Sequence, residues 1–117
     1  MSTYAHAYFF KNKKSLKQFQ VDINRDYGWK DWKNHPSVIK STFYHFSVGM
    51  FRMLKELDYT LDPDNISVAL RASDLDELKL KDKCNENDIN TLKEGFKETK
   101  AEFVFIVKDF KQTLSLV

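Results

Sequence analysis

Large apolar residues recur at intervals of three and four positions in two parts of the chain. The first series lies in the middle of the sequence and consists of Ile39, Phe43, Phe46, Met50, Met53 and Leu57. The second lies toward the C-terminus and consists of Ile89, Leu92, Phe96, Phe103, Ile106 and Phe110. Because residues spaced in this way share one face of an α-helix, the pattern predicts two long helices, at about 36–58 and 86–114.

Helix-ending and helix-starting residues predict further helices. Gly28 can close a helix over about 3–26, or over 14–26 alone, because glycine adopts the left-handed conformation found after helix ends. Pro63 suits the first turn of a helix, where its missing N–H costs nothing. The main prediction for the fold is therefore an all-α compact bundle of about four to five helices, the shorter ones at 63–71 and from Ser73 onward.

Three segments also fit β-strands. Tyr4, His6 and Tyr8 alternate with alanines, and the segments 66–70 (ISVAL) and 103–107 (FVFIV) are rich in β-branched or aromatic residues. The alternative prediction is thus an α+β fold with a small sheet formed by segments near 3–10, 66–70 and 102–107. The regular spacing on both sides of 103–107 favours a helix there, and the bundle is preferred for that reason.

Two glycines fall inside the predicted long helices. Gly49 and Gly95 would each cost about 1 kcal/mol relative to alanine in a helix interior. Close approach of two helix backbones would explain them, and a tolerated or slightly bent site is the alternative. Substitution by alanine lowers the melting temperature in the first case and raises it in the second.

Length and composition limit the classes of protein to which the chain can belong. The chain has 117 residues, of which 42% are hydrophobic, with only three Gly and two Pro. These values predict a single domain, 1–117, that buries its own core. The one cysteine, Cys84, cannot form an internal disulfide, and the first residues lack the order of charges typical of a signal peptide. Since the longest apolar runs fall far short of roughly 20 residues, we expect a soluble, cytoplasmic protein without a membrane segment.

Charge is distributed unevenly along the sequence. Residues 1–40 contain eight Lys or Arg and three Asp, whereas residues 56–88 contain ten acidic and four basic residues. The net charges of these segments are therefore +5 and −6. The uneven distribution predicts a basic and an acidic surface, or two regions that face and partly neutralise each other.

The best candidate for a binding site is the aromatic and basic segment before Pro36. Its proposed partner-binding residues are Tyr27, Trp29, Lys30, Trp32 and Lys33. Tryptophan and tyrosine are favoured anchors in protein interfaces, and aromatic rings interleaved with lysines also suit single-stranded nucleic acids. The two tryptophans could equally close one end of the bundle. A second basic cluster suits an acidic partner or a solvated helix face, and consists of Lys11, Lys13, Lys14 and Lys17.

No catalytic, metal-binding or nucleotide-binding motif is present in the sequence. The three histidines show no ligand spacing with one another or with Cys84, and His45 is expected to have a hydrogen-bonded structural role. We therefore expect no catalytic residues, no metal and no cofactor. The predicted function is a non-enzymatic interaction module that binds a protein partner as an inhibitor, immunity-type or accessory protein. The alternative is a nucleic-acid-binding protein that uses the basic, aromatic-containing N-terminal third.

Overall fold

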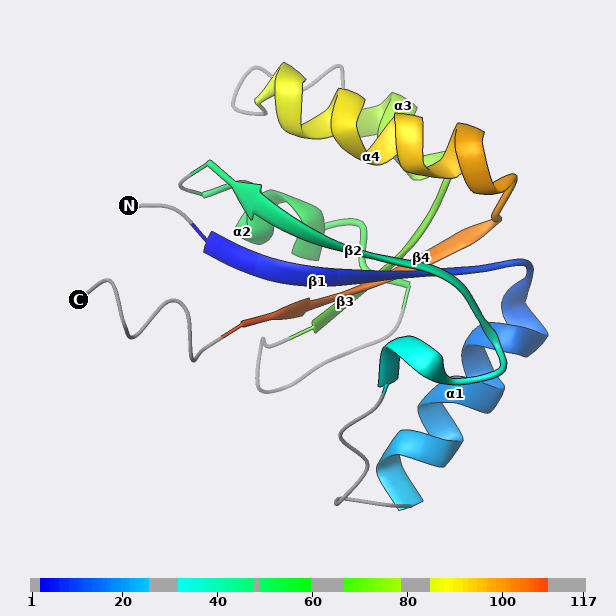
Figure 1. Cartoon of the computed structure of the whole chain (residues 1–117). Helices are drawn as coiled ribbons and strands as arrows, with labels where there is room; N and C mark the ends of the chain where they lie inside the picture. The colour runs from blue at the N-terminus through cyan, green and yellow to red at the C-terminus, as the bar shows by residue number, and fades with distance from the viewer. Residues whose placement is uncertain (1–2, 26–31, 48, 60–66, 79–84, 110–117) are drawn as a thin grey trace.

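The protein is an α+β domain built on one antiparallel sheet. The computed structural model describes residues 3–25, 32–47, 49–59, 67–78 and 85–109. Within these ranges the strands occur in the order β2-β1-β4-β3, and every neighbouring pair is antiparallel (Figure 1). The elements are β1 (Thr3–Phe10), α1 (Lys13–Arg25), the 3-10 helix η1 (Trp32–Asn34), β2 (Val38–Phe46), α2 (Met50–Lys55), β3 (Ser67–Arg71), α3 (Asp74–Leu78), α4 (Glu86–Thr99) and β4 (Phe103–Lys108).

The predicted all-α bundle is wrong. The long helix expected at 36–58 is instead the strand β2 followed by the short helix α2. Phe43 and Phe46 explain the error, because they lie on opposite faces of β2, the first exposed and the second buried. Residues three apart share a helix face, but they are on opposite faces of a strand. The apolar series therefore combined residues from both sides of the sheet.

The second long helix, expected at 86–114, ends at Thr99. Lys100 adopts a left-handed conformation with φ 56°, and the chain then enters β4. Four consecutive residues of β4 are buried, so both of its faces are apolar and no alternation marks it as a strand. The part of this predicted helix beyond Asp109 lies outside the described residues.

The shorter elements show the same competition between helix and strand. The helix expected at 63–71 is replaced by β3, and the N-terminal part of the helix expected at 3–26 is β1. The three segments of the alternative α+β prediction are all strands, although that prediction did not include β2. The helix at 14–26 is confirmed through Arg25, and the helix start at Ser73 is confirmed by α3.

One face of the sheet is covered by α2, α3 and α4. Its strand residues include Ala5, Ala7 and Phe9 of β1, all fully buried. The apolar residues that the helices pack against them are Met50, Phe51, Leu54, Leu75, Ile89, Leu92 and Phe96. Gly95 is needed on this face because a Cβ at that position would overlap the Phe9 ring. The close approach expected for Gly95 is therefore real, but it brings a helix against a strand rather than against another helix.

Among the described residues, the other face of the sheet is covered at one end, by α1 together with Trp32 of η1 and Tyr59. Leu16 and Phe19 of α1 pack on Tyr8, Phe10 and their neighbours Phe103 and Phe105 in β4. Figure 1 shows α4 and α1 on opposite sides of the sheet. A section of β1 and β2 on this face therefore has no helix from the described part of the chain over it.

A buried histidine joins α1 to η1. His35 Nε2 lies 2.9 Å from Asp22 Oδ2, and the backbone N–H of Ser37 donates to His35 Nδ1 over 3.0 Å. Since Nδ1 accepts, Nε2 carries the hydrogen and donates to the carboxylate. Hydrogen bonds from His35 and then from Gln18 lower the pKa of Asp22 below its ordinary value. His35 is thus a structural residue.

The outer edge of β3 is protected by the chain that follows α2. The N–H of Tyr59 donates to the Ala69 carbonyl over 2.6 Å, and the N–H of Ala69 donates to Asp58 Oδ1 over 2.7 Å. The backbone N–H and the carbonyl of Ala69, which point away from β4, therefore both have hydrogen-bond partners. This arrangement blocks pairing with another chain at the centre of β3.

We predict that Gly95→Ala destabilises the protein. Alanine is the better helix former by about 1 kcal/mol, but its methyl group must displace the buried Phe9 ring. Overpacking of this kind costs about 1–3 kcal/mol, so the free energy of unfolding measured with urea should fall. Asn90→Ala is the matched control on the exposed side of α4 and should be neutral or stabilising. An equal gain in both variants would show that the ring moves without cost.

We also predict that Asp22→Asn reduces stability in a pH-dependent manner. A carboxyl with a lowered pKa in the folded state stabilises that state above its unfolded pKa of about 3.9. This contribution disappears as the pH falls through the folded pKa. The free energy of unfolding measured with urea should therefore be lower for Asp22→Asn than for the wild type at pH 6. The difference between the two proteins should become smaller below about pH 4. The exposed Glu98→Gln is the control, and a gap that stays constant down to pH 3 would contradict the assignment.

Candidate functional site

The uncovered end of the second sheet face carries a group of aromatic side chains. Ala5 and Ala7 point to the helix-covered side, so the alternating residues Tyr4, His6 and Tyr8 point to the other side. The register of β1 with β2 places Tyr4 opposite His45, His6 opposite Phe43 and Tyr8 opposite Ser41. We define the aromatic face as Tyr4, His6, Tyr8, Phe43 and His45.

The rings of the aromatic face contact one another across the two strands. The centroids of Tyr4 and His45 are 4.4 Å apart with an interplanar angle of 7°, and those of Tyr4 and Phe43 are 5.5 Å apart. His6 lies 5.1 Å from Phe43. Such cross-strand pairs stabilise a sheet. They also fix the orientation of the rings, so the face is preorganised before anything binds to it.

Two large apolar side chains remain exposed on this side of β2. Phe43 and Ile39 are each 47% exposed; Phe43 is paired with His6 of β1, and Ile39 lies where the β1–β2 register shifts. Both alternate with residues that point to the helix-covered side. Exposure of a phenyl ring among other aromatic rings differs from a singly exposed apolar residue, which is common on protein surfaces.

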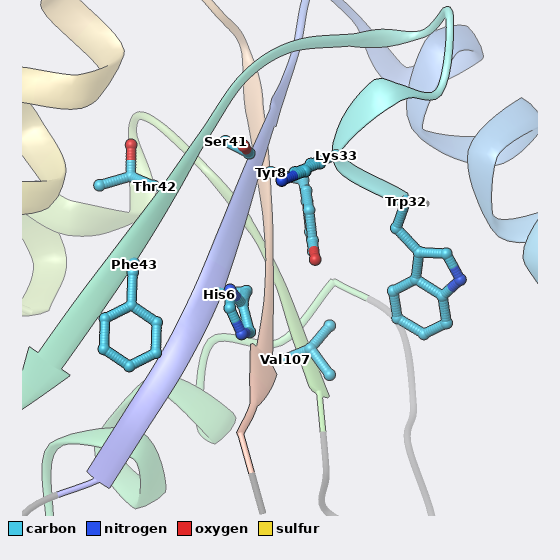
Figure 2. Close-up of a pocket in the computed structure, with 8 residues that line it drawn as sticks. All are labelled: His6, Tyr8, Trp32, Lys33, Ser41, Thr42, Phe43 and Val107. Atoms are coloured by element: carbon cyan, nitrogen blue, oxygen red, sulfur yellow. The ribbon is translucent and has the colours of Figure 1, made fainter. Parts of the chain in front are cut away.

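The aromatic face forms one wall of an open hollow with a volume of about 690 Å³. In Figure 2, Phe43 and Trp32 lie on opposite sides of this hollow, with His6 and Tyr8 between them. Val107 of β4 contributes an apolar side chain next to His6. The described residues that line the hollow are His6, Tyr8, Trp32, Lys33, Ser41, Thr42, Phe43 and Val107.

Trp32 is held against α1 and β1 by aromatic contacts. Its ring is 6.0 Å from Phe19 and 6.3 Å from Tyr8, measured between centroids. The indole Nε1 is buried and has no hydrogen-bond partner among the described residues. A buried donor that lacks a partner costs about 1–3 kcal/mol, so this tryptophan is maintained by its packing. It therefore serves the fold as well as the hollow.

The polar groups of the face carry little net charge. His6 Nε2 is 2.9 Å from Asp109 Oδ2, and the N–H of Asp109 donates to the Tyr4 carbonyl over 2.8 Å. Burial raises the pKa of Tyr8, and the nearby Asp109 carboxylate raises it further. The Tyr8 hydroxyl is thus a neutral donor at physiological pH. Lys33 supplies the one ammonium group of the lining.

The described residues of the face hold neither a catalytic pair nor a cluster of metal ligands. Within the described residues, His6 is hydrogen-bonded to Asp109 and to no hydroxyl, so the face contains no nucleophile paired with a base. No group of three or more His, Cys, Asp or Glu in the described part of the chain could hold a metal ion. What the face offers is stacking, apolar contact and a few hydrogen bonds.

The predicted partner-binding residues separate into two groups. Trp32 and Lys33 line the hollow, so the structure brings them together with the aromatic face. Tyr27, Trp29 and Lys30 lie outside the described residues, as does Cys84. His45, expected in a structural hydrogen-bonding role, is exposed and stacked on Tyr4. The sequence did not lead us to predict the residues of β1 as part of the site. The alternation of ring-bearing side chains with alanines in this strand was the signal that could have identified them.

No protein-family model matches the chain, and neither a curated protein nor a solved structure matches it significantly. Across the described residues, none of the helices combines the length and the apolar character required to cross a bilayer. Any function must therefore follow from the chemistry of this chain's own residues.

Proposed function

We propose that this protein is a non-enzymatic interaction module that binds a protein partner on the aromatic face. The observation that carries the proposal is the exposed, cross-stacked cluster around Phe43. Aromatic residues dominate the hot spots of protein interfaces, where a preorganised ring loses little conformational entropy on binding. A contiguous apolar surface beside an open hollow is typical of an interaction site.

The charge of the face favours a protein over a nucleic acid. Binding of single-stranded nucleic acid combines stacking rings with a positively charged groove that follows the phosphates. Here the described lining holds one lysine, Lys33, and His6 of the same lining is hydrogen-bonded to the Asp109 carboxylate. Nucleic-acid binding, inhibitor-type activity and a cytoplasmic location stay predictions of the sequence.

We predict that Phe43→Ser abolishes or strongly weakens partner binding. A photo-crosslinking amino acid at His45 would capture the partner, which is then purified and titrated against the variant. Loss of a central aromatic anchor should weaken binding by at least about tenfold, since hot-spot residues contribute 2 kcal/mol or more. The circular dichroism spectrum should stay that of the wild type, and the melting temperature should fall only modestly, because the half-exposed ring contributes cross-strand contacts but no core packing.

Val21→Ser is the matched control for this experiment. Val21 is 57% exposed on α1, away from the aromatic face, and its substitution removes similar apolar character. Equal affinities for both variants would contradict the proposal. Binding of an oligonucleotide at low salt that Phe43→Ser abolishes would replace the protein partner with a nucleic acid. Trp32 is a less suitable probe, because its contacts with Phe19 and Tyr8 make loss of folding the expected result.

A further inference from the structure

A second group of residues lies at the α1-covered end of the same sheet face. Lys13 and Lys17 come from α1, Tyr59 follows α2, and Arg71 is the last residue of β3. The Lys13 ammonium lies 5.0 Å from the Tyr59 ring centroid, and the Arg71 guanidinium carbon lies 5.1 Å from it. We call Lys13, Lys17, Tyr59 and Arg71 the cationic cluster.

The cations of this cluster have no carboxylate partners within the described chain. Lysines elsewhere form ion pairs, such as Lys40 with Glu98 and Lys93 with Asp76, each at 2.6 Å. Asp74 is close to Arg71, but its carboxylate accepts from the Arg71 backbone N–H rather than pairing with the guanidinium. Three segments of the chain therefore bring side chains of like charge together, and no described carboxylate forms an ion pair with them.

The phenol of Tyr59 shows the local effect of this charge. A hydrogen bond from Lys13, together with the charges of Lys13 and Lys17 and a hydrogen bond from Arg71, lowers the pKa of Tyr59 below its ordinary value. The position thus favours negative charge on an oxygen atom. The first turn of α1 contains no acidic side chain, and its helix dipole adds to the same preference.

We propose that the cationic cluster binds a phosphate dianion, either free or as the terminal group of a small metabolite. The Arg71 guanidinium has the planar fork that matches phosphate oxygens, and the two lysines supply point charges on a second side. The protonated Tyr59 hydroxyl can donate to a third oxygen. This inference is independent of the proposed protein-binding function, because it concerns the opposite end of the sheet face.

Calorimetric titration with inorganic phosphate, against sodium chloride at matched ionic strength, tests the proposal. Lys17→Gln and Arg71→Gln should each weaken phosphate binding about tenfold, the effect of one charge-assisted hydrogen bond. Lys97→Gln removes an exposed lysine on α4 and should leave the affinity unchanged. Equal affinities for Lys17→Gln, Arg71→Gln and Lys97→Gln would overturn the site. Because Arg71 also packs over Phe103, Lys17→Gln with an unaltered melting temperature is the decisive variant.

A second measurement locates the bound anion. Tyrosine ring NMR should show the titration of Tyr59 moving to higher pH in the presence of phosphate, because the anion offsets the neighbouring cations. Tyr8 and Tyr44, whose pKa values are raised by burial, are internal controls and should not move. An unchanged Tyr59 titration at saturating phosphate would overturn the proposal. Glucose 6-phosphate in place of phosphate distinguishes the sources: tighter binding assigns a phosphorylated metabolite, and weaker binding assigns free phosphate.

Discussion

The pairing of β1 with two neighbours is the constraint on which the rest of the structure depends. β1 is an inner strand that pairs with β2 along its length and with β4 over most of it. Its backbone is therefore fixed on both sides, and its alternating side chains are assigned to opposite faces. Ala5 and Ala7 leave room for helices on one face, while Tyr4 and His6 occupy the other. A shift of one residue would bury the aromatic face under α4 and expose the alanines.

The helices cover the two faces of the sheet unequally. Three helices share the face that holds Phe9, whereas the described cover of the other face, mainly α1 with Trp32 of η1, lies beside Tyr8 and Phe10. The remaining rows, with Tyr4 and His6, are stabilised by ring contacts across β1 and β2 instead of by a helix. The exposed aromatic side chains thus result from the architecture, and their mutual stacking compensates in part for the missing cover.

The sequence predicted α1 well, but it failed for β2, which has large apolar residues on both faces, and for β4, which is buried on both faces. α1 has a single apolar stripe that includes Leu16 and Phe19, and its position could be predicted closely. β4 is buried on both faces, so Phe103 and Ile106 fit a helical spacing as well as a strand. The decision between the two rests on hydrogen bonds to β1, a segment about a hundred residues away, and no local pattern contains that information.

The candidate site was predictable to the same limited extent. Trp32 and Lys33 were found because tryptophan next to lysine is a recognisable local feature. Phe43 was assigned to a core stripe because its neighbours at intervals of three and four are apolar, and its exposure depends on which face of β2 remains uncovered. Asp109 could not be connected with His6 from the sequence, since β4 places them together across the sheet.

Phe19 supports both proposed surfaces at once. Its ring contacts Tyr8 and Phe105 of the sheet as well as Trp32 and His35, at centroid distances between 5.2 and 6.0 Å. The contact with Trp32 sets one wall of the hollow beside the aromatic face. The same ring holds α1 on the sheet, and α1 in turn carries the two lysines of the cationic cluster. Because interiors are closely packed, a change in the seating of α1 cannot be confined to one end of the face. The two surfaces therefore share one rigid support, although they differ in the chemistry of what they can bind.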